Sequence, residues 1–101
     1  MSQRLILRPE AEKDIAEAAA WYDQQRPGLS LQFRAALDNT FASIEQHPRL
    51  YSQVYRSLRR ALVRRFPYGV FYTPRVEELV VVAVLHTARS PRLWRGRFEG
   101  R

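Results

Sequence analysis

His86 and Arg89 are the residues of this chain whose types and spacing are best suited to chemistry. An imidazole changes its charge near neutral pH, so His86, beside several arginines, could act as a general base or acid. It could equally orient the residues after it through a hydrogen bond, and we favour that structural role. Arg89 lies in a predicted turn, where an arginine has little use in a core. We expect it to bind a partner or act in a reaction, unless it pairs with Glu77, Glu78 or Glu99.

A metal site is not expected in this chain. The two histidines, His47 and His86, lie far apart and have no cluster of carboxylates beside them, and the chain contains no cysteine. His47 directly precedes Pro48, a position typical of the C-terminal cap of a helix or of an exposed side chain. We therefore predict neither a metal nor another cofactor.

Positive charge is concentrated in the second half of the chain. Residues 1–54 carry six basic against seven acidic side chains, a net charge of −1, whereas residues 55–101 carry eleven arginines against three acids, a net charge of +8. The two halves add up to the total of +7. A GC-rich genome would explain the preference for arginine over lysine, but it does not explain this separation. Such a surface attracts phosphate groups or an acidic protein segment, and its binding should weaken with salt.

Length and composition predict a single domain spanning residues 1–101. The chain has 101 residues, of which 46% are hydrophobic. This is enough to form one core, and it argues against a chain that is disordered throughout. No run of about 20 apolar residues is present, and the start of the chain has too short an apolar stretch for a signal peptide. The absence of cysteine fits a reducing compartment. We expect a cytoplasmic protein that does not enter a membrane.

The first half predicts one strand and a helical hairpin. Residues 4–8 form a short strand, and Pro9 then suits the first turn of a helix. Apolar residues at helical spacing predict that this helix packs inward, with Trp21 also in the core or against the hairpin. After a break at residues 26–28, Ser30 is the expected N-cap of a second helix that ends at His47. The apolar stripe of this second helix consists of Phe33, Leu37, Thr40, Phe41 and Ile44.

The second half predicts three strands, over residues 59–66, 68–73 and 79–86, preceded by a loop over residues 49–57. The last strand is almost uniformly aliphatic, as expected for a strand buried on both faces. Residues 90–97 then leave the sheet, with Leu93 or Trp94 folding back over it. The predicted fold class is α+β, in the order β-α-α-β-β-β, with the helical hairpin packed on a mainly antiparallel four-stranded sheet. Arginines at the rim of that sheet form the expected working surface.

Two motifs, taken with this order of elements, indicate a family. They are FPY-x-x-x-Y at residues 66–72 and H-x-x-R-x-P-x-x-W-x-x-R at residues 86–97. Together they make nearly the whole chain resemble the RelE/ParE superfamily of toxins from bacterial type II toxin–antitoxin systems, also called the plasmid stabilisation family. The resemblance implies a small, basic, cytoplasmic protein that stops growth and forms a hetero-oligomer with a cognate acidic antitoxin.

The resemblance leaves the target open between DNA gyrase and the ribosome with its mRNA. RelE-like members cleave mRNA with lysine, arginine and tyrosine on the concave sheet face, which requires proton transfer and cations around the phosphate. For this alternative the catalytic residues would be Arg65, His86 and Arg89. Because the sheet offers no lysine and no acid near the motifs, we favour the ParE-like role, poisoning of gyrase. A further alternative is a non-toxic basic interaction module. The residues expected to bind a partner or nucleic acid are Arg60, Arg64, Tyr72, Arg92, Trp94, Arg95 and Arg97.

Overall fold

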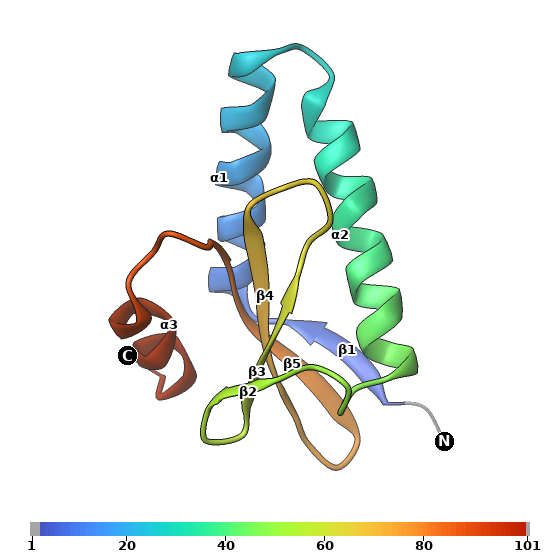
Figure 1. The fold of residues 1–101 in the computed structure, drawn as a ribbon, viewed down its shortest axis with the longest axis vertical. Coiled ribbons are helices and arrows are strands. Elements are labelled where there is room, and N and C mark those ends of the chain that lie inside the picture. The colour runs from blue at the N-terminus through green and yellow to red at the C-terminus, as the bar shows by residue number, and fades with distance from the viewer. Residues whose placement is uncertain (1–2, 101) are drawn as a thin grey trace.

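A five-stranded sheet carries a helical hairpin on one face and a short helix on the other (Figure 1). The structure is a computed structural model and describes residues 3–100. The elements are β1 (Arg4–Leu7), α1 (Pro9–Gln25), α2 (Leu29–Gln46), β2 (Gln53–Tyr55), β3 (Leu58–Leu62), β4 (Tyr68–Pro74), β5 (Glu78–His86) and α3 (Pro91–Phe98). The strand order is β1-β5-β4-β3-β2, with β1 parallel to β5 and the other pairs antiparallel. The predicted fold class is confirmed.

The hairpin face of the sheet holds the larger core. Ile15 and Tyr22 of α1 and Phe33, Leu37 and Ile44 of α2 are buried there against β3, β4 and β5. The rings of Tyr22 and Phe33 pack with those of Phe66 and Tyr68 at centroid separations of 5.0 to 6.0 Å. The apolar stripes predicted from helical spacing are therefore the buried faces of both helices.

Two aromatic residues are less buried than predicted. The ring of Trp21 contacts Tyr22 edge-on at 5.2 Å, but Trp21 remains 53% exposed. Of the two places predicted for Trp21, the core is wrong, because helical rotation turns residue 21 away from the face that Tyr22 buries. Phe41 lies at the margin of the stripe and is only partly buried.

The link between the two helices differs from the predicted cap. Gly28, with φ of 87°, occupies the N-cap position of α2, a conformation in the left-handed region that glycine adopts without steric cost. Ser30 is the second residue of α2, and its backbone N–H and its hydroxyl both donate to the Asp23 carboxylate, at 2.9 and 2.8 Å. The backbone hydrogen bond from Ser30 is the main cause that lowers the pKa of Asp23. Ser30 therefore ties the two helices together instead of capping α2.

The second half contains more regular structure than predicted. Residues 53–55, expected in a loop, pair with β3 as a fifth strand too short to show a period of its own. The strand predicted over residues 59–66 ends at Leu62, because the Val63 N–H donates to the Tyr68 carbonyl at 2.9 Å and closes a turn there. Arg64 and Arg65 consequently lie in the β3–β4 turn, where Arg65 has a φ of 72°.

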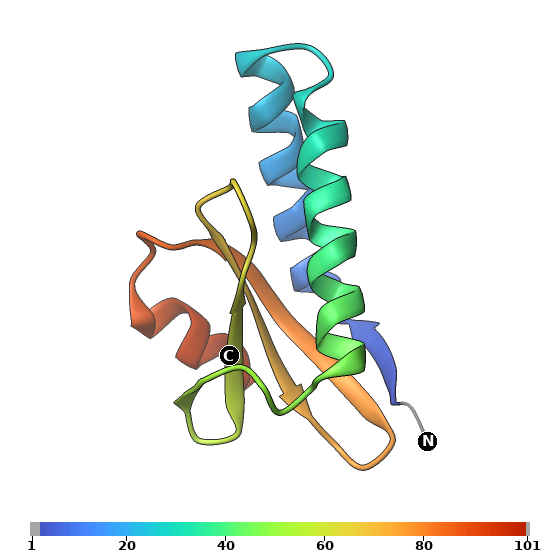
Figure 2. The ribbon, with the colours of Figure 1, turned by 45° about the vertical axis from the view of Figure 1, so that its right-hand side comes forward.

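The tail forms α3, which covers the second face of the sheet (Figure 2). Ser90 starts the helix by accepting a hydrogen bond from the Arg92 N–H at 3.2 Å, and Pro91 occupies its first turn. Trp94 is buried and stacks on Phe71 with ring centroids 5.1 Å apart, which confirms the predicted return of the tail to the sheet. The apolar residues of this second core are Leu58, Phe71, Val80, Val82, Ala83, Leu85 and Trp94.

An ion pair between Asp14 of α1 and Arg97 of α3 fixes the position of α3. Both carboxylate oxygens of Asp14 accept from the Arg97 guanidinium, at 2.8 and 2.9 Å. Asp14 also accepts from the Val84 N–H at 3.0 Å, and Arg97 donates to the Val82 carbonyl at 3.1 Å. Val82 is the extra residue of a bulge, since Tyr72 faces Val81 and Phe71 faces Ala83. The pair thus satisfies backbone groups where the strand pairing is irregular.

No helix in residues 3–100 combines the length and the apolar character needed to cross a membrane.

Candidate functional site

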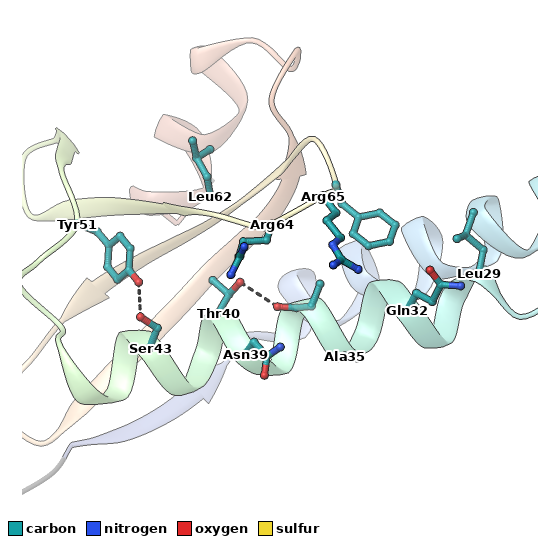
Figure 3. A pocket seen from close by; sticks show the side chains of 12 residues that line it. Leu29, Gln32, Ala35, Asn39, Thr40, Ser43, Tyr51, Leu62, Arg64 and Arg65 are labelled. Carbon is teal, nitrogen blue, oxygen red and sulfur yellow. Dashed lines mark hydrogen bonds between the residues drawn. The ribbon is translucent and has the colours of Figure 1, made fainter.

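A groove between α2 and the β3–β4 turn has a volume of about 660 Å³ (Figure 3). Its apolar side chains come from both walls and include Leu29, Ala36 and Phe66. Arg64 and Arg65 extend from the turn toward α2. We call this feature, with its full lining, the α2 groove: Leu29, Gln32, Ala35, Ala36, Asn39, Thr40, Ser43, Tyr51, Leu62, Arg64, Arg65 and Phe66.

The hydroxyl groups of the α2 groove are already bonded within the protein. The Thr40 hydroxyl donates to the Ala36 carbonyl at 3.0 Å, and the hydroxyls of Ser43 and Tyr51 bond to each other. Neither Arg64 nor Arg65 forms an ion pair with another residue in the described part of the chain. The charge that the groove offers to a ligand is therefore that of the two guanidinium groups.

The backbone of Arg65 is held in an uncommon conformation. A φ of 72° lies in the left-handed region, which side chains other than glycine occupy at a cost of roughly 1–3 kcal/mol. The tight turn needs this conformation to bring Phe66 back into the aromatic cluster with Tyr22 and Phe33. It leaves Arg64 and Arg65 exposed beside α2.

The three residues predicted to be catalytic do not line one site. Arg65 lines the α2 groove, whereas Arg89 lines a separate hollow of about 550 Å³ beside α3. His86 is exposed, and its Nδ1 accepts a hydrogen bond from the Ala88 N–H at 3.0 Å. This bond fits the structural alternative for His86, in which the imidazole orients the turn after β5. Arg89 forms none of the predicted ion pairs with Glu77, Glu78 or Glu99 within residues 3–100.

Tyr72 was predicted to bind a partner but lies in the core. It is fully buried, and its hydroxyl donates to the Pro48 carbonyl at 2.6 Å. Burial is the main cause that raises the pKa of Tyr72 to about 12. The prediction of an accessible Tyr72 is wrong because this position of β4 points to the face that the hairpin covers.

Trp94 and Arg97 are also less accessible than predicted. Trp94 is buried because the apolar second face of the sheet needs a cover. The Arg97 side chain is only 17% exposed and is neutralised by Asp14. Hydrogen bonding to Asp14 is the main cause that raises the pKa of Arg97. Both residues therefore hold α3 in place.

The remaining predicted binding residues are accessible. Arg60 is half-buried, and its stem lies where a Cβ on Gly69 would come within 3.1 Å of its carbons. Arg64, Arg92 and Arg95 are exposed. Arg56 is also exposed but was not among the predicted binding residues; its guanidinium carbon lies 5.1 Å from the centroid of the Tyr55 ring. The only local feature of the sequence that could have indicated Arg56 is its position directly after the aromatic residue Tyr55.

One comparison with known proteins identifies a family, and another identifies the fold. A model of the ParE toxin of the type II toxin–antitoxin system parDE matches residues 5–91. A solved chain from the chromosomal ParDE system of P. aeruginosa superposes with a TM-score of 0.74 at 12% identity, covering 83% of this chain and 95% of that one. At this identity the likeness establishes the fold. No curated protein matches the chain. The family match and the shared fold confirm the resemblance found in the sequence: the chain belongs to the ParE toxin family of type II toxin–antitoxin systems.

Proposed function

We propose that this protein is a single-domain toxin that stops growth by poisoning DNA gyrase in the cytoplasm and is neutralised by a cognate acidic antitoxin. The choice of gyrase as the target rests mainly on the second face of the sheet, which is covered by α3. An mRNA-cleaving cluster on the sheet needs an exposed face with groups for proton transfer. Here one face lies under the hairpin, and the other is apolar and lies under Trp94 of α3. Gyrase poisoning requires no such cluster.

The protonation properties of the candidate groups support the same choice. Tyr72, a sheet tyrosine predicted to bind a partner or nucleic acid, has a pKa of about 12 and no exposed surface. A group with such a pKa is a poor proton carrier near neutral pH. His86 remains exposed but lines neither the α2 groove nor the hollow beside α3.

The α2 groove is the proposed binding site of the antitoxin. It combines apolar contacts from α2 with the two guanidinium groups of Arg64 and Arg65. An amphipathic acidic segment matches both features, because its apolar side enters the groove while carboxylates meet the arginines. The toxin and antitoxin would then form a hetero-oligomer.

The target is tested with purified protein in two assays. We expect inhibition of gyrase supercoiling, and no cleavage of message in a translating extract mapped by primer extension. His86→Ala should inhibit gyrase as well as the unsubstituted protein. Message cleavage without gyrase inhibition, lost in His86→Ala, would instead assign the RelE-like activity. Inactivity in both assays would leave the non-toxic interaction module.

The antitoxin site is tested by the double variant Arg64→Gln/Arg65→Gln. We expect its affinity for the antitoxin encoded beside the toxin gene to fall on the order of 10-fold or more, with a weaker dependence on salt. The matched control, Arg34→Gln/Arg75→Gln, removes the same charge from exposed positions outside the α2 groove. Equal losses in both variants would contradict a specific role of the groove.

A further inference from the structure

A second basic surface lies on the outward side of α3 and on the β2–β3 turn beside it. It consists of Arg56 in the turn, Arg89 before α3, and Arg92 and Arg95 within α3, all of them exposed. Within residues 3–100, only Arg56 of these four forms an ion pair, with Glu99 at 3.6 Å. Four positive groups and one negative group leave a charge of +3. We call these four arginines the α3 surface.

Aromatic rings hold two of these guanidinium groups in fixed positions. The guanidinium carbons of Arg56 and Arg95 lie 5.1 and 5.2 Å from the centroid of the Tyr55 ring, and that of Arg95 lies 5.6 Å from the Trp94 ring. The rings are themselves fixed, since Trp94 is buried and the Tyr55 hydroxyl donates to Glu99 at 2.8 Å. Cation–π contacts stabilise a guanidinium without neutralising it. A ligand therefore meets charges that are already oriented, which reduces the entropy lost on binding.

The arginines of α3 point to two different sides of the helix. Arg97 points inward and is neutralised by Asp14. Arg92 and Arg95 are exposed and lie three positions apart, so they are neighbours on one side of the helix. Within residues 3–100, no ion pair neutralises Arg92 or Arg95, so both keep their charge for a ligand.

The chemistry of the α3 surface fits phosphate groups better than a protein segment. The hollow beside it is lined by Arg89, Ser90, Arg92, Leu93 and Gly96. Leu93 is the only large apolar side chain among them, and it is partly buried against the second core. Protein interfaces depend on apolar anchors in pockets, which the α2 groove offers and this hollow does not. Binding to a phosphate backbone depends mainly on cations and hydrogen-bond donors.

We propose that the α3 surface binds the phosphate backbone of duplex DNA independently of its sequence. The choice of duplex DNA rests on the proposed function, because a protein that acts on gyrase meets the DNA that gyrase holds. The toxin then contacts its target complex twice, once through protein and once through DNA.

The test measures binding of the purified protein to labelled duplex DNA by fluorescence anisotropy, without gyrase. Two duplexes of about 20 base pairs and unrelated sequence are compared at about 50 and 200 mM salt. Four phosphate contacts predict that affinity falls roughly 10²-fold between these salt concentrations. Both duplexes should bind equally, and a strong preference for one sequence would overturn the proposal.

The decisive variant is Arg89→Gln/Arg92→Gln/Arg95→Gln. Its affinity at the lower salt should fall on the order of 10²-fold or more, and its logarithmic salt slope should decrease by about 2.7. The matched control, Arg26→Gln/Arg34→Gln/Arg75→Gln, removes three exposed charges elsewhere and should bind almost normally. All six side chains are exposed, so both variants should remain folded, and loss of the Arg95 cation–π contacts should lower the unfolding midpoint of the first variant only slightly. Equal weakening of both variants would mean that overall charge drives binding, and would overturn the proposal.

Two other probes distinguish the class of ligand. A poly-glutamate peptide that binds through the α3 surface while duplex DNA does not would assign an acidic protein instead. Tighter binding of single-stranded RNA of equal length would exclude duplex DNA as the preferred ligand. Gyrase inhibition by a protein that does not bind duplex DNA would remove this inference and leave the proposed function intact. Duplex binding without gyrase inhibition would contradict the proposed function and leave DNA binding by the α3 surface intact.

Discussion

The two faces of the sheet are covered by different means. On one face, α1 and α2 span 17 and 18 residues and bury a continuous apolar layer with a cluster of aromatic rings. On the other, α3 has 8 residues, one buried aromatic side chain and one ion pair to α1. Contacts on the hairpin face are numerous, so each contributes a small part. The α3 face depends on few contacts, and each should matter more.

Removal of the ion pair should have the largest effect on stability. Asp14→Ala leaves the Arg97 guanidinium without its anionic partner and the Val84 N–H without its acceptor, and breaking a buried pair on one side typically costs about 3–5 kcal/mol. Urea unfolding measures this loss in the free energy of unfolding. The double variant Asp14→Ala/Arg97→Ala should lose less than the two single variants combined. Strict additivity would show that the two side chains act separately.

Truncation on the hairpin face should have a somewhat smaller effect. Leu37 is 2% exposed in the centre of the α2 stripe, and Leu37→Ala should cost about 2–4 kcal/mol through lost burial and the cavity left behind. Phe41→Ala is the control, because Phe41 is only partly buried and should cost less despite its larger ring. Thermal unfolding followed by circular dichroism compares the two. A greater loss for Phe41→Ala would mean that another surface covers that residue in solution.

The smallest expected effect concerns the Tyr72 hydroxyl. Tyr72→Phe removes one hydrogen bond to the Pro48 carbonyl and should cost about 1 kcal/mol at neutral pH. The folded-state pKa of about 12 lies above the ordinary value of 10.0, so this tyrosine contributes stability below pH 10 that is lost as pH rises through 12. Stability measured across this range should therefore fall less steeply in Tyr72→Phe. Burial also raises the pKa values of Tyr22 and Tyr68, so part of the decline should remain. An unchanged slope would mean that Tyr72 does not titrate with unfolding.

Local patterns predicted the hairpin and the long strands well. Helical spacing identified Phe33 and Leu37 as core residues, and the aliphatic run of β5 indicated burial on both faces. Ser90 and Pro91 are also recognisable signals for the start of α3, although that helix was not predicted. These features depend on neighbours in the sequence, which is why they can be read from it.

The candidate site was predicted less well because its residues depend on distant partners. Strand alternation places Tyr68 and Tyr72 on one face but does not say which face the hairpin covers. The role of Arg97 depends on Asp14, which is 83 positions away in the chain. The turn at Arg65 and the short strand β2 likewise arise from pairing across the sheet. Of the predicted binding arginines, those on exposed turns and on the outer side of α3 kept their expected accessibility.

The parallel pairing of β1 with β5 affects how the protein folds while the ribosome synthesises it. Arg4 lies opposite Glu78, so β1 has no strand partner until most of the chain has been translated. Asp14 obtains its partner Arg97 still later, because 83 residues separate the two in the chain. Synthesis of 83 residues takes roughly 4–17 seconds at ordinary elongation rates of about 5–20 residues per second. The helical hairpin can form early, but β1 and Asp14 obtain their partners only near the end of synthesis. A chain that stops before α3 therefore lacks both the Arg97 partner of Asp14 and the Trp94 side chain that covers the second face of the sheet.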